Sequence, residues 1–418
     1  MRTRLTAVLA AAVVATTLTT AVMAEEKGNW IGTWTASAQP AWGFDFPVPL
    51  GMQTNLWNQT IRQVARVSIG GSKVRIVVSN EYGTLPLTIG AAHIGVTKDG
   101  STIEPNSGKP LTFSGQASIT VPPGAPAISD PVDLEVDPLS EVSVSLYFPE
   151  SAPVTTMHWD GHQTAYLAAG NKVAEEDLKA DATQTQRAFL TGIMVEAPDD
   201  ARAIVLFGDS ITDGDGSTID GNDRWPDTLA ERLAEAGGPP VAVLNQGISG
   251  AKVLSDRMGV NALARFDRDV LNQPHADTVV LMMGINDIGW PGSGLALHDP
   301  EPTADQIIAG YRQLIARAHA DGMRIIGATL TPFGDSFAGT PFEGYYTPEK
   351  EVIRLAVNEF IRSSKEFDGV IDFDKVVVDP AKPGYIKAEF DKGDHLHPNA
   401  AGYDAMAASI DLGLLAQQ

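Results

Sequence analysis

A serine in a glycine-bearing turn is the first residue of this sequence that could do chemistry. Ile204 to Phe207 is an unbroken apolar run, typical of a strand buried on both faces of a sheet. Gly208, Asp209 and Ser210 follow it directly and favour a sharp turn. Because open α/β sheets bind ligands at the carboxyl ends of their strands, Ser210 is the candidate nucleophile.

A serine hydroxyl needs a base to become a nucleophile, and the end of the sequence offers one. Asp394 and His397 lie three residues apart in a short loop, so the carboxylate can hold the imidazole in the tautomer that accepts a proton. With eight histidines and many aspartates, one such spacing is also expected by chance. His395 is the rival base, but Lys392 stands where its acid would be. We expect the remaining histidines to be surface or packing residues: His93, His158, His162, His275, His298 and His319.

Two more polar turns follow predicted strands. The strand at 241–244 runs into Gly247, and the strand at 278–283 runs into Asn286. In a parallel sheet these turns share one edge with Ser210, where a serine, a glycine N–H and an asparagine amide could surround one oxygen, as an oxyanion hole requires. Each turn alone is equally typical of an ordinary loop, and only their joint placement indicates chemistry.

The sequence around Ser210 has a near copy. Residues 207–210 recur at 333–336, where Ser336 also follows a predicted strand. Ser336 lies in a long aromatic loop that runs to Tyr346 with no helix close behind it, so we predict Ser210 as the nucleophile. We interpret the loop 333–346, and the loop 289–298, as a wall or lid over the acyl pocket. An ordinary packed loop is the alternative.

The pattern of predicted secondary structure around these residues changes at about Pro198. Before it, short runs alternate apolar and polar residues, as at 142–148, and clusters of Gly and Pro separate them. This pattern, with one wet face per strand, predicts an all-β sandwich or jelly roll. After it, strands and helices alternate, which predicts a doubly wound parallel sheet covered on both faces. We expect strands at 203–207, 241–244, 278–283, 323–329 and 369–373, and helices near 224–236, 255–271, 303–319, 347–363 and 399–414.

Two helix starts are well marked. Thr303 and Gln306 form a capping box. Thr347 is an N-cap residue, and Pro348 occupies the first helical position after it.

The first residues predict export. A basic start is followed by a short apolar run that ends before the acidic pair at 25–26, and this run is too short to span a bilayer. We expect a signal peptide at 1–24, a β-sandwich domain at 25–199 and an α/β domain at 200–418. The protein would then be secreted or periplasmic, and a retained membrane anchor is the alternative.

Composition excludes several function classes. The formal net charge of −22 repels nucleic acid and anionic lipid. The absence of cysteine excludes disulfides and thiol chemistry. An acidic stretch at 213–223 could hold Ca²⁺, but Thr218 and Arg224 stand where an EF-hand needs glycine and glutamate. We therefore expect a solvated acidic loop, with no metal and no cofactor.

These turns, in their order, resemble the four blocks of the SGNH (GDSL) hydrolases: Gly208-Asp209-Ser210, Gly247, Gly284-Ile285-Asn286-Asp287 and Asp394-x-x-His397. The resemblance covers the chain from about Ala203 to its end. Thr212 stands where the nucleophile elbow of α/β-hydrolases has its second glycine, so that family is excluded.

The resemblance implies roles for the site residues. Ser210 would be the nucleophile, His397 the base and Asp394 the residue that orients it. The backbone N–H groups of Ser210 and Gly247 and the side chain of Asn286 would form the oxyanion hole. It also implies a three-layer α/β/α, flavodoxin-like fold and ester hydrolysis without a cofactor.

We therefore expect an exported serine esterase acting on small-molecule or carbohydrate-linked acyl esters, with short-chain or acetyl esters favoured. Some members of the resembled family carry a β-sandwich before the hydrolase domain, including carbohydrate deacetylases. One alternative is a carbohydrate-binding or adhesion protein with a vestigial hydrolase domain, suggested by the aromatic stretch 42–46. The other is a metal-dependent hydrolase that uses the acidic loop 213–223.

Overall fold

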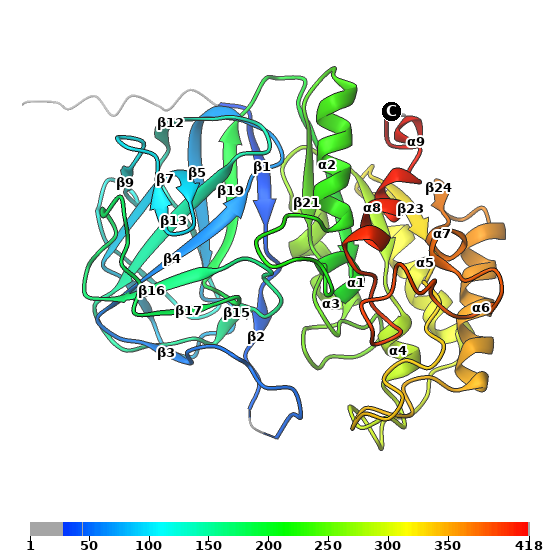
Figure 1. The fold of residues 1–418 in the computed structure, drawn as a ribbon. Coiled ribbons are helices and arrows are strands. Elements are labelled where there is room, and N and C mark those ends of the chain that lie inside the picture. The colour runs from blue at the N-terminus through cyan, green and yellow to red at the C-terminus, as the bar shows by residue number, and fades with distance from the viewer. Residues whose placement is uncertain (1–27, 44, 417–418) are drawn as a thin grey trace, which may run out of the picture.

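The computed structural model describes residues 28–43 and 45–416. The predicted signal peptide at 1–24 lies outside the described residues. Figure 1 shows two halves side by side, a β-rich half in blue to green and an α/β half in green to red. Among the described residues, no helix is both long and apolar enough to cross a lipid bilayer.

The first half consists mostly of short antiparallel strands. One sheet has the order β1-β19-β5-β11, and another has the order β17-β16-β4-β13-β7-β8. Their bounds are β1 (Trp30–Thr35), β2 (Gln39–Pro40), β3 (Asn55–Leu56), β4 (Gln59–Arg66), β5 (Gly71–Ser79), β6 (Leu87–Ile89), β7 (Ala91–Asp99), β8 (Thr102–Ile103), β9 (Lys109–Leu111), β10 (Ile119–Val121), β11 (Pro126–Ile128), β12 (Val132–Val136), β13 (Glu141–Phe148), β14 (Ala152–Pro153), β15 (Thr156–His158), β16 (Ala165–Ala169), β17 (Ala182–Gln184), β18 (Arg187–Ala188) and β19 (Leu190–Glu196).

Strand β13 differs from its prediction on one face. Its apolar residues are buried as the alternation predicts, but Ser143 and Ser145 are buried too. The prediction of a solvent-exposed face is wrong at these two positions, because neighbouring strands supply partners: Arg62 donates from Nε to the Ser145 hydroxyl at 2.8 Å, and the Thr97 hydroxyl lies 2.9 Å from that of Ser143. The guanidinium group of Arg62 also donates to backbone carbonyls of Ser101 and Glu175, so its burial is compensated.

The second half contains a parallel sheet that confirms the predicted strands to within a few residues. Its strands are β20 (Arg202–Gly208), β21 (Val241–Asn245), β22 (Ala276–Met282), β23 (Arg324–Ala328) and β24 (Gly369–Ile371). The order is β21-β20-β22-β23-β24, with all neighbouring pairs parallel. Strand β20, the first strand of this sheet, therefore lies between β21 and β22, so the turns after these three strands meet at one edge.

Both faces of this sheet are covered. Ala203, Val205 and Phe207 of β20 belong to a core shared with residues of α5 and α6, whereas Ile204 and Leu206 share a core with residues of α2 and α8. All five are fully buried, which explains the unbroken apolar run. The helices are α1 (Ser210–Asp213), α2 (Trp225–Ala236), α3 (Ala262–Phe266), the π-helical turn η1 (Asp267–Leu271), α4 (Ile285–Gly289), α5 (Ala304–Ala320), α6 (Pro348–Ser363), α7 (Phe373–Val377), α8 (Ala400–Ala408) and α9 (Leu412–Ala416).

The predicted helix starts at Thr303 and Thr347 are confirmed, because both side chains cap their helices. Two predicted helices are shorter than expected. The helix predicted near 255–271 begins only at 262, because Asn261 caps it. The helix predicted near 399–414 ends at Ala408. A separate helix, α9, begins at Leu412, and the preceding Asp411 side chain accepts the N–H of Gly413 in its first turn.

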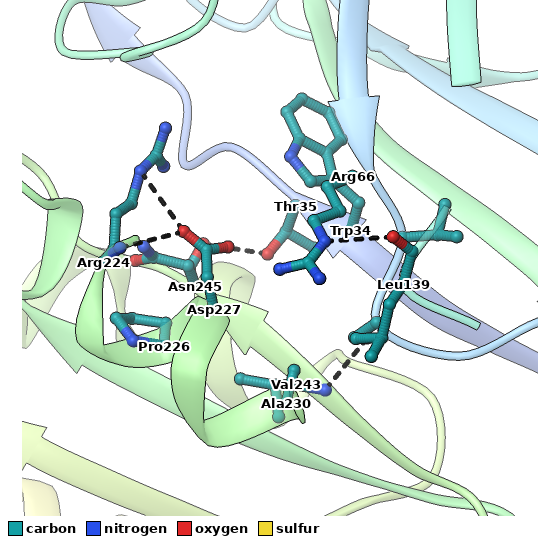
Figure 2. Close-up of a pocket in the computed structure, with 12 residues that line it drawn as sticks. Trp34, Thr35, Arg66, Leu139, Arg224, Pro226, Asp227, Ala230, Val243 and Asn245 are labelled. Carbon is teal, nitrogen blue, oxygen red and sulfur yellow. Dashed lines mark hydrogen bonds and ion pairs between the residues drawn. The ribbon is translucent and has the colours of Figure 1, made fainter. Parts of the chain in front are cut away.

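The two halves meet along β1 and β21, which lie side by side in Figure 1. A cavity of about 40 Å³ lies in this seam, and Figure 2 shows the side chains of both halves that line it. Across it, the Thr35 hydroxyl donates to the Asn245 carbonyl at 2.9 Å. A space of this size admits water but no substrate, so the cavity is part of the packed seam.

Candidate active site

Ser210 is the first residue of the short helix α1. Asp209 caps this helix by accepting the N–H of Ile211, and Gly214 ends it with a positive φ of 113°. The Ser210 N–H lies in the first turn, where backbone N–H groups have no partner within the helix. Burial raises the pKa of Asp209 to about 7. The sequence predicts a turn here, and a four-residue helix is too short to show a helical period.

The structure brings Ser210, His397 and Asp394 together. The Ser210 Oγ atom lies 2.8 Å from Nε2 of His397, and the Nδ1 atom of the same ring lies 2.6 Å from the Asp394 carboxylate. Asp394 also accepts the backbone N–H groups of Leu396 and His397, at 3.0 and 2.9 Å. These two bonds curl the loop and bring residues three apart within contact. Ser210 and His397 are 4% and 5% exposed.

The charge around His397 favours its protonated form. Burial alone would lower the pKa of the imidazole, but the carboxylates of Asp215 and Asp394 outweigh that effect and raise it above its usual value. Asp215 Oδ2 lies 3.4 Å from Nδ1 of His397. Lys392 forms ion pairs with both carboxylates. The pKa of Asp394 is held well below its usual range, because the nearby His397 and Lys392 outweigh its burial.

Asn286 is held in one orientation by two donors. The indole N–H of Trp290 and the hydroxyl of Tyr345 both donate to its side-chain carbonyl, at 2.8 and 2.9 Å. Because an indole N–H can only donate, this contact identifies the oxygen of the amide. Its nitrogen donates to the carbonyl of Ala251 at 3.0 Å, and the NH₂ group carries a second hydrogen.

Gly247 is packed against α1, the short helix that begins at Ser210. Its N–H donates to the side-chain oxygen of Asn245 at 2.9 Å, so this candidate oxyanion donor has a partner in the structure. A Cβ atom added to Gly247 would lie 2.3 Å from the backbone nitrogen of Asp213. The residue is therefore glycine because the backbone of α1 approaches it closely.

The rival residues have other partners. Ser336 is buried, and its hydroxyl donates to the carbonyls of Phe333 and His395. His395 pairs with Asp391, four residues earlier, a partner that the spacing of three did not reveal. Ser336 thus anchors its loop to the loop that carries His397.

Both aromatic loops contact residues of the candidate site, which does not distinguish a wall over an acyl pocket from an ordinary packed loop. The Phe337 ring lies 6.3 Å from the His397 ring and 5.2 Å from that of Tyr345. The Lys350 ammonium group ties the loops together by donating to carbonyls of Gly289, Pro291 and Gly344.

The acidic loop 213–223 is solvated over only part of its length: residues 218–221 are exposed as the sequence predicts, whereas its first residues are buried. Asp213 is 1% exposed, and its carboxylate lies 2.8 Å from Nε2 of His158. Asp220 accepts the N–H and the hydroxyl of Thr164, both at 2.6 Å. The expectation is wrong for Asp213, because the β-rich half supplies a partner, His158, that the local sequence cannot show. One ligand atom from each of Asp160, His162 and Asp215 lies within 4.8 Å of the others, a spacing that could hold a metal ion.

Comparison with known proteins identifies the family of the second half. Residues 204–410 match the family described as GDSL-like Lipase/Acylhydrolase. This region belongs to the GDSL family. The chain therefore carries an ester hydrolase domain, as the sequence blocks predict. A search of curated proteins finds no match to the chain.

Solved structures similar to the GDSL domain include three named esterases or lipases. A carbohydrate acetylesterase from Sinorhizobium meliloti is 19% identical with a TM-score of 0.38, over 51% of this chain and 99% of that one. A lipase/acylhydrolase from Enterococcus faecalis is 24% identical with a TM-score of 0.39, over 50% and 92%. A GDSL-like lipase from Bacteroides thetaiotaomicron is 19% identical with a TM-score of 0.37, over 51% and 88%.

Sequence reasoning missed several polar residues around the GDSL domain's site. Arg265 is buried and donates to the carbonyls of Gly208 and Gln246, at 2.9 and 2.8 Å, so it joins the turns after β20 and β21. His158 and His162 have acid partners, Asp213 and Asp160, at 2.8 Å each. For His158 that acid lies in the other half of the chain, so no local spacing could have revealed the pair.

Proposed function

We propose that this protein is an exported serine esterase that cleaves small acyl esters, with Ser210 as nucleophile, His397 as base and Asp394 as the residue that orients it. The observation that carries the proposal is the continuous contact from the Ser210 hydroxyl through the imidazole to the Asp394 carboxylate. Asp394 accepts from Nδ1, which leaves Nε2 of a neutral ring as a proton acceptor facing the hydroxyl.

The reaction would run in two halves. As Ser210 Oγ attacks the ester carbonyl carbon, its proton passes to Nε2 of His397, and the tetrahedral intermediate carries the negative charge. The bond to the alcohol oxygen then breaks, and His397 returns the proton to that oxygen. Water, deprotonated by His397, cleaves the acyl-enzyme and releases the acid.

In this proposal the intermediate's oxygen is bound by the backbone N–H groups of Ser210 and Gly247 and by the amide nitrogen of Asn286. Trp290 and Tyr345 support this role of Asn286, because they hold its carbonyl and so direct its NH₂ group. Asn245 already accepts the Gly247 N–H, so the oxyanion must share or displace that bond. We therefore assign the larger contribution to Asn286.

We propose short acyl groups, acetate above all, on a small-molecule or carbohydrate alcohol. Phe337, Tyr345 and Trp290 are bulky residues close to the site, which supports a short acyl pocket. The test is kcat/KM for p-nitrophenyl esters of rising chain length, beside acetate release from acetylated xylan. We expect the acetate ester to be cleaved best. A maximum at long acyl chains contradicts the proposed pocket.

We also propose the finer organisation of the chain. The two covered faces of the parallel sheet support a three-layer α/β/α, flavodoxin-like domain at 200–418. The paired antiparallel sheets support a jelly-roll-like sandwich at 25–199. Residues 1–24 would be the export signal of a secreted or periplasmic enzyme, and the protein would bind neither nucleic acid nor a membrane.

A metal-dependent hydrolase is the second candidate, favoured by the grouping of Asp160, His162 and Asp215. The ion pair between Lys392 and Asp215 weighs against it, because a cation already compensates this carboxylate. Prolonged dialysis against a chelator separates the two. The serine esterase keeps its kcat, whereas loss of activity that a divalent cation restores would favour the metal enzyme.

A carbohydrate-binding protein with a vestigial hydrolase domain has less support. The Phe46 ring stacks on Trp290 at 5.7 Å, and Trp42 packs on Phe46, so these aromatics join the two halves. Retention on a polysaccharide column without turnover of p-nitrophenyl acetate would favour it.

A further inference from the structure

A histidine of the β-rich half contacts the helix that carries the candidate nucleophile. Nε2 of His158 lies 2.8 Å from Oδ1 of Asp213, the last residue of α1 and three residues after Ser210. Both side chains are buried, with 6% and 2% of their surfaces exposed. A displacement of Asp213 moves the Ser210 backbone, because α1 is a single turn of helix.

The same carboxylate holds the loop of the second oxyanion donor. Oδ2 of Asp213 accepts the N–H of Ser249 at 2.9 Å, two residues after Gly247. The Ser249 hydroxyl in turn donates to the carboxylate of Asp160 at 2.6 Å. Asp160 belongs to the β-rich half, so this bond crosses back to the half that carries His158. His158, Asp213, Ser249 and Asp160 thus form a polar ring, and His158 and Asp160 are separated by one residue of the chain.

We propose that His158 and Asp160 are positioning residues of the esterase, which hold α1 and the Gly247 loop at the spacing that the reaction needs. This inference rests on the proposed function. It makes the β-rich half a structural component of the active site, because the GDSL domain alone lacks one side of the ring.

The charge of His158 strengthens the ring. Its Nδ1 lies 3.0 Å from the carbonyl oxygen of Ser37, and its Nε2 faces the Asp213 carboxylate. Both neighbouring atoms are oxygens that can accept, so the protonated ring, which donates from both nitrogens, satisfies both contacts. Burial would lower its pKa, but Asp213, its hydrogen bonds and Asp160 raise the pKa of His158 above the usual value. A charge-assisted bond of this kind is short and resists displacement.

Contacts between the halves that lie away from Ser210 provide a matched control. Arg66 of β4 and Glu231 of α2 form an ion pair at 2.8 Å across the same seam. Glu231→Gln removes it without changing the size of the side chain and without touching the ring. If the β-rich half contributes only to stability, loss of the His158–Asp213 contact or of the Arg66–Glu231 ion pair should lower the Tm and leave kcat unchanged.

The experiment compares the full-length chain with H158A, H158Q, D160N and E231Q. It measures kcat and KM for p-nitrophenyl acetate, the Tm of each variant, and the rate at which an organophosphate ester modifies Ser210. A misplaced nucleophile lowers kcat rather than ground-state binding, so we expect H158A to lose about 10- to 100-fold in kcat, with KM changed less than about threefold. Modification of Ser210 should slow in parallel.

H158Q retains an amide donor for Asp213, so we expect it to recover part of the lost kcat. D160N should show a smaller loss than H158A, and E231Q should keep its kcat whatever its Tm. Folded H158A and D160N with the kcat of the wild type would overturn the inference. So would an equal loss of kcat in E231Q.

S210A is assayed in parallel to separate the two proposals. If S210A is inactive while H158A is unimpaired, only the positioning inference fails. If S210A keeps its activity, the proposed nucleophile fails, whatever the ring variants do.

Discussion

The hydroxyl oxygen of Ser210 lies 2.8 Å from Nε2 of His397, although 187 positions separate the two residues in the chain. The turn after β20 supplies the serine, and the loop before α8 supplies the histidine. Because both groups are buried, the packing of the elements that carry them sets this distance. This contact links the fold to the proposed chemistry.

Removing the Ser210 hydroxyl should abolish turnover. We expect Ser210→Ala to lower kcat by about 10⁶-fold, as for other serine nucleophiles that act as a unit with their base. The measurement is p-nitrophenyl acetate hydrolysis, with circular dichroism to confirm folding. Ser336→Ala is the matched control, because it removes a buried hydroxyl that bonds only to carbonyls. A crippled S336A beside an active S210A would reverse the assignment.

Removing the Asn286 amide should cost less than removing the nucleophile. We expect Asn286→Ala to lower kcat by about 10²- to 10³-fold, the usual effect of one lost oxyanion donor. Tyr345→Phe keeps the amide but removes one of the two donors that orient it, so its loss should be smaller. Equal effects of the two substitutions, or a rise in KM without a fall in kcat, would contradict the oxyanion role.

The pH profile should report the raised pKa of His397. Only the neutral imidazole accepts the serine proton, and the pKa is raised above 6.5, so the acid limb of kcat/KM should lie above pH 6.5. Asp215→Asn removes one of the carboxylates that raise this pKa. The limb should then move to lower pH, with the alkaline plateau retained. An unchanged limb would mean that Asp215 does not act on the base.

Gly247 should not tolerate a side chain. The methyl group of Gly247→Ala would lie 2.3 Å from the nitrogen and 2.7 Å from the Cα of Asp213, both backbone atoms. We expect α1 to shift, with a lower Tm and a large loss of kcat. Gly237→Ala is the control, because an added Cβ there meets nothing within 4 Å and probes only backbone strain. Wild-type kcat in G247A would show that the loop moves freely.

Much of the α/β half could be predicted because its signals are local. Apolar runs mark β20 to β24, and the caps at Thr303 and Thr347 mark two helices. The helical conformation of α1 could not be predicted, because a single turn is too short to show the 3.6-residue spacing of apolar side chains. The break after Ala408 was missed because Asp411 acts as a cap within a continuous apolar pattern.

The site was predictable where partners are close in sequence and not where they are distant. Asp394 and His397 are three residues apart, whereas His158 and Asp213 are 55 apart and lie in different halves. No spacing rule connects such residues. The burial of Ser143 and Ser145 in β13 was missed for the same reason, because their partners, Thr97 and Arg62, lie on other strands.

The late position of the Asp394–His397 loop has a consequence for biosynthesis. A ribosome finishes the β-rich half and the turn that carries Ser210 long before it adds this loop, so a nascent chain holds the proposed nucleophile without its proposed base. Under the proposed roles, the site is complete only once this loop is in place beside α8, where Tyr403 donates to the Asp215 carbonyl. In the proposed mechanism, a chain that lacks this loop has no base for Ser210 and should not turn over esters.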